Sequence, residues 1–185
     1  MKYYKKEDLI KCYRSEGRCE IACKDACKDR KEREKCPLKQ AVRKMPNGID
    51  ENMEALVAEV LDPLATVYGK PMAVVEGFVC PRRCQLENKK LLRMHVKGDA
   101  VQISAVGLQG NDLRLENLEI VRAIVQNGKF DVMILMDTTT TGAGPKRVFV
   151  SYCRGKNQGV IMKTVEGGDE LVELSELDRA QVMSD

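Results

Sequence analysis

The sequence predicts an α+β protein in which a small antiparallel sheet packs against helices. Three observations lead to this fold class. Short β-branched runs alternate with helical patterns between residues 46 and 165, and two of the helical patterns are strongly amphipathic. The chain of 185 residues is also long enough to bury one substantial core.

The first long helix is expected to run from Asp50 to Tyr68. Asp50 is a residue type that caps helices, Pro63 should bend the helix or begin a new turn, and Gly69 is a natural terminator. The residues at helical spacing predict its apolar face: Met53, Leu56, Val57, Val60, Leu61 and Leu64.

The remaining elements follow in order along the chain. A strand is expected within residues 72–78, and a second helix over residues 117–126 with Leu118, Val121, Ile124 and Val125 facing inward. The central strands are expected at residues 100–106, 130–136 and 147–152, and a final hairpin strand at residues 159–165. A flexible loop is predicted between Asp137 and Pro145.

Charge divides the chain into three segments. Residues 1–45 form a basic, cysteine-rich and helix-permissive segment with fifteen Lys and Arg against eight Asp and Glu. Residues 46–165 form the α+β domain, and residues 166–185 form an acidic tail. The basic segment could attract phosphate-rich partners, or it could be a solvated face that docks the tail. Nucleic acid is an unlikely partner on composition, because aromatic residues that stack bases are not interleaved with these charges.

No apolar run approaches the roughly 18–20 residues that span a bilayer, so no membrane partner is expected. The first eight residues contain no apolar stretch of the signal-peptide type. The sequence therefore predicts a cytoplasmic protein, in which eight cysteines would mostly stay reduced.

The cysteines of the N-terminal segment offer a separate chemistry. Cys19, Cys23 and Cys27 recur every four residues, so a helix would place the three thiols on one face. With Cys36 they could hold a structural zinc. The segment lacks the Cys-x-x-Cys pairs of zinc ribbons, and burial of the thiols as small apolar groups or disulfide formation are the alternatives.

A series of short motifs also occurs in a fixed order along residues 49–152. They are Leu61-Asp62-Pro63-Leu64, Tyr68-Gly69-Lys70-Pro71, Glu76-Gly77-Phe78-Val79-Cys80-Pro81, His95 with Gly98 and Ala100, Asn117-Leu118-Glu119-Ile120, Asn127-Gly128-Lys129-Phe130-Asp131 and Arg147-Val148-Phe149-Val150-Ser151-Tyr152. This ordered set resembles the zinc D-Ala-D-Ala carboxypeptidases of the Hedgehog/DD-peptidase fold, particularly the small phage-encoded members.

The resemblance implies that the catalytic positions are degenerate. His95, the only histidine of the chain, occupies a ligand position, but Gln102 stands at the Asp ligand and Phe149 at the second His ligand. Met136 stands at the general base, and Val79 stands at the substrate-binding Arg. Because a catalytic zinc needs imidazole and carboxylate donors with one position open for water, no metal is expected at this site.

The expected function is therefore that of a pseudoenzyme. The resemblance implies a binding or structural module whose old cleft could still hold a peptide or peptidoglycan fragment, with no cofactor at the family site. The alternative is an active peptidoglycan-directed metallopeptidase, or another hydrolase with a non-standard site. Nucleophilic catalysis gains no support, because Ser104 and Ser151 have at most one histidine to share as a base.

Overall fold

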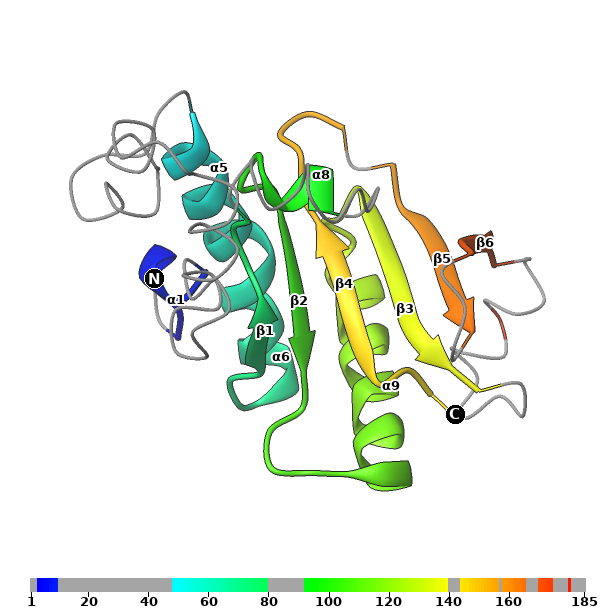
Figure 1. Ribbon diagram of the computed structural model, residues 1–185. Helices are drawn as coiled ribbons and strands as arrows, with labels where there is room; N and C mark the ends of the chain where they lie inside the picture. The colour runs from blue at the N-terminus through cyan, green and yellow to red at the C-terminus, as the bar shows by residue number, and fades with distance from the viewer. Residues whose placement is uncertain are drawn as a thin grey trace, which may run out of the picture.

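The computed structural model describes residues 3–9, 48–79, 92–139, 144–156, 158–165, 170–174 and residue 180. Within these ranges the elements follow in this order: α1 (Lys6–Leu9), α5 (Ile49–Leu56), the π-helical segment η2 (Val57–Leu61), α6 (Asp62–Tyr68), β1 (Ala73–Glu76), α8 (Leu92–His95), β2 (Ala100–Ser104), α9 (Gly110–Asn127), β3 (Val132–Thr138), β4 (Arg147–Ser151), β5 (Val160–Val165) and β6 (Val172–Glu173). Figure 1 shows the strands side by side in one sheet, with α9 crossing behind it.

The sheet confirms the α+β class but is larger and more mixed than predicted. The strand order is β1-β2-β4-β3-β5-β6, and every neighbouring pair is antiparallel except β3 and β5, which are parallel. The strand predicted over residues 159–165 is present as β5 and pairs antiparallel with the next strand, β6, but it is not the final strand, and its other edge pairs in parallel with β3. Because β4 occupies one edge of β3, the chain after β4 pairs with the other edge, where the amide of Val160 donates to the carbonyl of Asp131 at 3.1 Å.

The long helix of residues 49–68 is confirmed, with one difference at its start. Gly48 is its N-cap residue, so Asp50 lies in the first turn and is not the cap that the sequence suggested. Pro63 lies in the first turn of α6, which begins directly after the π-helical segment, in line with the expectation that this proline begins a new turn. A proline has no N–H to donate to the carbonyl four residues earlier. That carbonyl belongs to Glu59, and the side-chain amide of Asn127 donates to it at 3.1 Å.

Helix α9 begins at Gly110, earlier than the predicted start at Asn117. Residues 110–116 are mostly polar and show no clear helical spacing of apolar residues, so the sequence pattern does not predict that they are helical. Both Arg114 and Asn117 are buried on the inner face of the helix, and each is used for hydrogen bonds to loops of the sheet.

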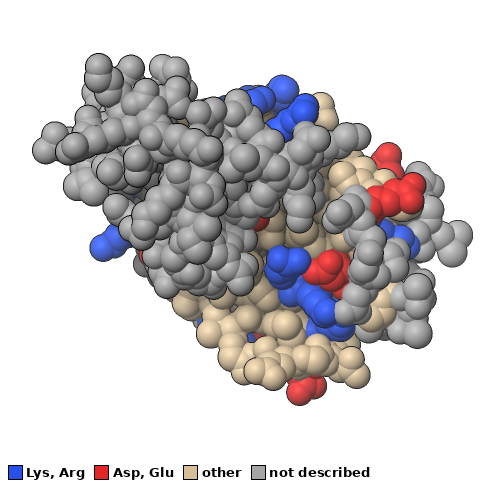
Figure 2. Space-filling view, viewed as in Figure 1, with Lys and Arg blue, Asp and Glu red and all other residues tan. Residues whose placement is uncertain are grey.

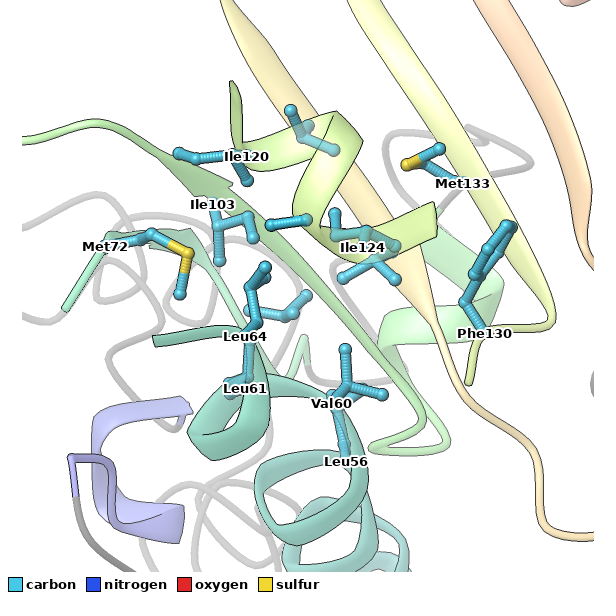
Figure 3. Packing of buried hydrophobic residues seen from close by; sticks show 14 of the residues in the cluster. Leu56, Val60, Leu61, Leu64, Met72, Ile103, Ile120, Ile124, Phe130 and Met133 are labelled. Carbon is cyan, nitrogen blue, oxygen red and sulfur yellow. The ribbon is translucent and has the colours of Figure 1, made fainter. Parts of the chain in front are cut away.

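The main core lies between one face of the sheet and the helices α5, α6 and α9. Figure 3 shows side chains from α5, η2 and α6 meeting those of α9 and of strands β2 and β3. The labelled residues of this cluster are Leu56, Val60, Leu61, Leu64, Met72, Ile103, Ile120, Ile124, Phe130 and Met133. The amphipathic faces predicted for the two helices therefore meet each other and the sheet, although Leu118 and Val125 are only partly buried.

Residues 3–9 belong to the same packing unit as the later chain. Tyr4 and Leu9 are buried in the main core, and the backbone amides of Tyr3 and Tyr4 donate to the Asp62 carboxylate at 2.9 and 3.1 Å. The carbonyl of Leu9 accepts from the amide of Phe78 at 2.7 Å. The N-terminal residues are thus fastened to both α6 and the end of β1.

At the other end of the chain, β6 extends the sheet beyond residue 165. The amide of Leu174 donates to the carbonyl of Ile161 at 3.0 Å, and the Leu174 side chain is buried. In the part of the chain that the structure describes, no helix is both long enough and apolar enough to cross a membrane.

Candidate functional site

The candidate site lies on the sheet face that points away from α5, α6 and α9. Five residues form a row across five neighbouring strands, each pairing with the next in register: Glu76, Gln102, Phe149, Ile134 and Met162. Alternation along a strand puts the residues on either side of Phe149, Val148 and Val150, into the main core. The row therefore forms the centre of the opposite face.

Phe149 is the centre of a small second core on this face. It is fully buried and clusters with Ala100 and Ile134. Partly buried apolar residues surround this group: Met94, Val132, Met136, Met162 and Leu171. The ring of Phe149 is therefore packed as a core residue would be.

His95 ends the short helix α8 and lies against Phe149. The two ring centroids are 5.3 Å apart and the rings are nearly perpendicular, at 86°. The imidazole is completely buried. Its backbone carbonyl accepts from the amide of Gly98 at 3.2 Å, which closes the turn that leads into β2.

Gly98 explains why the chain can turn so close to α5. Its φ of 74° lies in the left-handed region, and an added Cβ would come within 2.9 Å of the Ile49 carbonyl oxygen. Only glycine meets both conditions. The turn at Gly98 therefore fixes the position of His95 over the row of five residues on the sheet.

Gln102 is held by a glutamate that the resemblance did not mark as functional. The Gln102 side-chain Nε2 donates to Glu76 Oε2 at 2.9 Å, and Gln102 is only 4% exposed. A carboxylate can only accept, so the amide must turn its nitrogen toward Glu76 and its oxygen away. Among the described residues, the buried Oε1 of Gln102 has no hydrogen-bond donor.

Asp99 does not replace the missing carboxylate ligand. Asp99 comes directly before β2, and strand alternation puts its side chain on the opposite side of the sheet from that of Gln102. The backbone carbonyl of Asp99 accepts from the amide of Tyr152 at 2.8 Å. Burial raises the pKa of its carboxyl above the usual value, with Asp131 adding to the rise and Lys97 and Lys156 opposing it. This environment disfavours the charged form of Asp99.

The structure brings together three of the five positions that the resemblance singled out. His95, Gln102 and Phe149 are neighbours, as described above. Met136 lies two residues further along β3 from Ile134, on the same face and opposite Arg147. Val79 is different, because its side chain is buried in the main core and only its amide approaches His95, at 3.4 Å from the carbonyl oxygen.

The residues present do not fit a catalytic zinc. Within the described ranges, no group of three or more His, Cys, Asp and Glu side chains could hold a metal ion. One imidazole, one amide and one phenyl ring offer a single good ligand, whereas a catalytic zinc takes three. The proposed thiol ligands Cys19, Cys23, Cys27 and Cys36 lie outside the described residues.

Two buried polar residues of α9 were missed by sequence reasoning. The guanidinium of Arg114 donates to the carbonyls of Asp137 at 2.6 Å and Gly144 at 2.8 Å, so it holds both ends of the connection between β3 and β4. Asn117 accepts from the Ala105 amide at 2.8 Å and donates to the Lys146 carbonyl at 2.8 Å. Polar residues in a helical pattern ordinarily indicate its solvent face, so the sequence carried no signal for either role.

The described charges on the visible face do not gather into one basic surface. Figure 2 shows blue and red side chains next to each other over the lower part of this face, with uncharged surface between the groups.

No protein-family model matches the sequence, and no match was found among the curated proteins or solved structures with which it was compared.

Proposed function

We propose that the chain is a catalytically inactive protein of the DD-peptidase type, a binding or structural module that has kept the scaffold and lost the metal. The Hedgehog/DD-peptidase fold is part of this proposal. The ligand is proposed to be a peptide or peptidoglycan fragment, held on the sheet face that carries His95 and Gln102.

The placement of Phe149 is the observation that carries the proposal. Two imidazoles that share one tetrahedral zinc, each with a Zn–N bond of about 2.0–2.1 Å, have ring centroids about 5 Å apart. The rings of His95 and Phe149 are separated by 5.3 Å. A phenyl ring thus stands where a second imidazole ligand would fit, and Gln102 lies directly opposite it in register.

The chemistry of the three side chains supports the loss of activity. Zinc in such enzymes lowers the pKa of its bound water from about 16 toward 7 and polarises the carbonyl that is attacked. A phenyl ring offers no lone pair, and Gln102 offers a neutral oxygen where a carboxylate is needed. Neither a nucleophile nor an oxyanion partner can form without the metal.

The test is the release of D-alanine from a muramyl pentapeptide by the purified protein with added zinc. We expect no release above background, and no zinc that depends on His95. Turnover that is abolished by a chelator and by His95→Ala would overturn the proposal in favour of the active metallopeptidase. Zinc content should be measured in parallel on a Cys19→Ser/Cys23→Ser/Cys27→Ser variant, so that metal held by the cysteines is not mistaken for metal at His95.

A further inference from the structure

We propose that Asn127 is a deamidation site that the fold protects, and that its conversion to aspartate or isoaspartate separates the end of α9 from the π-helical segment η2. Asn127 is the last residue of α9, and Gly128 follows it in the left-handed conformation. A glycine at this place has no side chain that hinders attack on the asparagine amide, so the Asn-Gly dipeptide deamidates readily in an unfolded chain. The inference uses no residue of the sheet face around Phe149 and is independent of the proposed function.

The reaction needs only water as a co-reactant. The backbone nitrogen of Gly128 loses its proton and attacks Cγ of Asn127, where a new C–N bond forms and the bond to Nδ2 breaks, so that ammonia leaves. Water then opens the resulting cyclic imide at either carbonyl. Opening at the side-chain carbonyl gives aspartate, and opening at the backbone carbonyl gives isoaspartate.

In the folded chain both reacting groups are held by other hydrogen bonds. The amide of Gly128 donates to the carbonyls of Ile124 and Val125, each at 3.1 Å. The side-chain Nδ2 of Asn127 donates to the carbonyl of Glu59 at 3.1 Å. The attack therefore requires the last turn of α9 to open, and the same opening exposes the Gly128 amide to hydrogen exchange.

Contacts beyond Gly128 oppose this opening. Lys129 pairs with the carboxylate of Glu59, with 2.6 Å between Nζ and Oε2, and Glu59 belongs to η2. Phe130 is only 4% exposed and packs in the main core. Because the chain is attached on both sides of Gly128, the reactive conformation is a minor one and deamidation of the folded chain is slow.

The product does not fit the contact that the asparagine makes. A carboxylate at position 127 has no proton to donate, so it would place an oxygen against the Glu59 carbonyl oxygen. Pro63 has no N–H to give this carbonyl instead. The new charge would also lie at the C-terminus of α9, where the helix dipole disfavours a negative group. Deamidation is therefore a one-way change that weakens the contact between α9 and η2.

The first experiment compares deamidation in the folded and the urea-unfolded chain at the same mildly alkaline pH. Peptide mass mapping follows Asn127, and Asn47, which also precedes a glycine, is the internal standard for reactivity in urea. We expect Asn127 to react at least about tenfold more slowly in the folded chain. Equal rates in the two states, or an Asn127 that stays intact in urea while Asn47 reacts, would overturn the inference.

The second experiment asks whether the opening and the reaction are the same event. Lys129→Ala should raise both the hydrogen exchange of the Gly128 amide and the deamidation of Asn127, each by about two- to fivefold, since it removes one partly exposed ion pair. Lys70→Ala is the matched control, because it removes an ion pair with Glu116 of the same helix and should change neither rate. A rise in only one of the two rates in Lys129→Ala, or in neither, would contradict the inference.

The third experiment measures the effect of the product. In Asn127→Asp the Gly128 amide should exchange at least about tenfold faster than in wild type, because a hydrogen bond is lost and an oxygen faces the Glu59 carbonyl. Asn127→Gln keeps an amide donor and should show a smaller increase. Unchanged exchange in Asn127→Asp would overturn the proposed separation of α9 from η2. Thermal unfolding shows whether each variant is folded, and the comparison of folded and unfolded wild type needs no variant.

Discussion

Gln102 and Phe149 face each other on neighbouring strands β2 and β4, on the sheet side that points away from the long helices. Residues directly opposite in an antiparallel pair have Cβ atoms about 4.5–5.5 Å apart. The pair is therefore close enough to serve one ligand, yet one member is apolar and the other is engaged by Glu76. At these two positions the sheet face is therefore occupied by contacts within the protein.

Replacing Phe149 by alanine should lower the free energy of unfolding by about 3–5 kcal/mol, because the ring is fully buried and its removal leaves a cavity. Urea unfolding measures the change. Leu115→Ala is the matched control, since Leu115 is 61% exposed and its loss should change stability by less than about 0.5 kcal/mol. Similar effects of the two substitutions would show that the second core is not formed.

Asn117→Asp should destabilise the protein more strongly at neutral pH than at acid pH. Asn117 Nδ2 donates to the carbonyls of Pro145 and Lys146, and a charged carboxylate would place an acceptor against these oxygens. The expected loss is at least about 2 kcal/mol at pH 7. Asn117→Ala, which introduces no charge, should show a loss that depends much less on pH. The same pH dependence for both variants would contradict the assigned hydrogen bonds.

Tyr4→Phe should lower stability by about 1–3 kcal/mol without changing the fold. The Tyr4 hydroxyl donates to the Met72 carbonyl at 3.0 Å and accepts from the Met72 amide, and both groups are buried. Burial raises the pKa of Tyr4 to about 12, so the hydroxyl stays protonated in the physiological range. Hydrogen exchange at the Met72 amide measures the local effect, and unchanged protection there would contradict it.

Gly77→Ala should release the N-terminal residues from the domain. A Cβ at Gly77 would come within 1.9 Å of the Leu9 carbonyl oxygen, so this backbone must move. We expect residues 3–9 to become more accessible to proteolysis than in wild type. Gly155→Ala is a control for a glycine with open space around it, although its positive φ adds some strain of its own. Equal proteolysis of the two variants and wild type would show that residues 3–9 are not packed tightly against the rest of the domain.

Asp99→Asn should stabilise the protein at pH 7 and have little effect near pH 3.5. Because burial raises the pKa of Asp99 in the folded state, the folded chain binds its proton more tightly than the unfolded chain. Stability therefore falls as the pH rises from the ordinary value near 3.8 through the raised folded pKa. The substitution removes this fall, so its benefit should appear only above that window.

Urea unfolding of wild type and Asp99→Asn at both pH values measures this difference. For comparison, Glu170→Gln replaces an exposed carboxylate. A gain of equal size at pH 3.5 and pH 7 would show that the titration of Asp99 is not its source.

The local signals of the sequence predicted the fold class and most element positions. Gly69 ends the first helix in the left-handed conformation, as its residue type suggested, and the β-branched runs became strands. The parallel pairing of β5 could not be predicted, because it depends on which edge of β3 remains open after β4 has paired. The buried roles of Arg114 and Asn117 depend on loop carbonyls whose positions only the folded chain defines.

Part of the candidate site could also be predicted from the sequence. The resemblance singled out His95, Gln102 and Phe149, and the structure pairs Gln102 with Phe149 in register and puts the His95 ring against that of Phe149. Glu76 was missed because its contact with Gln102 arises from the pairing of β1 with β2, across 26 residues of chain. Val79, which the resemblance put at the position of the substrate-binding Arg, has its side chain in the main core and not in the cluster around Phe149.

The last prediction is that Gln102→Asp and Phe149→His together create zinc affinity in this chain. The two positions are directly opposite in register, and the ring at position 149 lies 5.3 Å from the imidazole of His95. Three ligands of the kinds that a catalytic zinc takes would then converge, with one position open for water. The aspartate would also be close to Glu76, and the bound cation would offset the repulsion between the two carboxylates.

Isothermal titration with zinc measures the gain, and we expect tight binding of about one zinc per chain beyond any that the cysteines hold. Adding Met136→Glu puts a carboxylate on the same sheet face. Release of D-alanine by this triple variant would test whether that carboxylate acts as a general base. His95→Ala in the double variant is the control and should remove the new site. No gain in zinc binding by a folded double variant would mean that the three positions do not converge as a ligand set, which would contradict the proposed DD-peptidase type of scaffold.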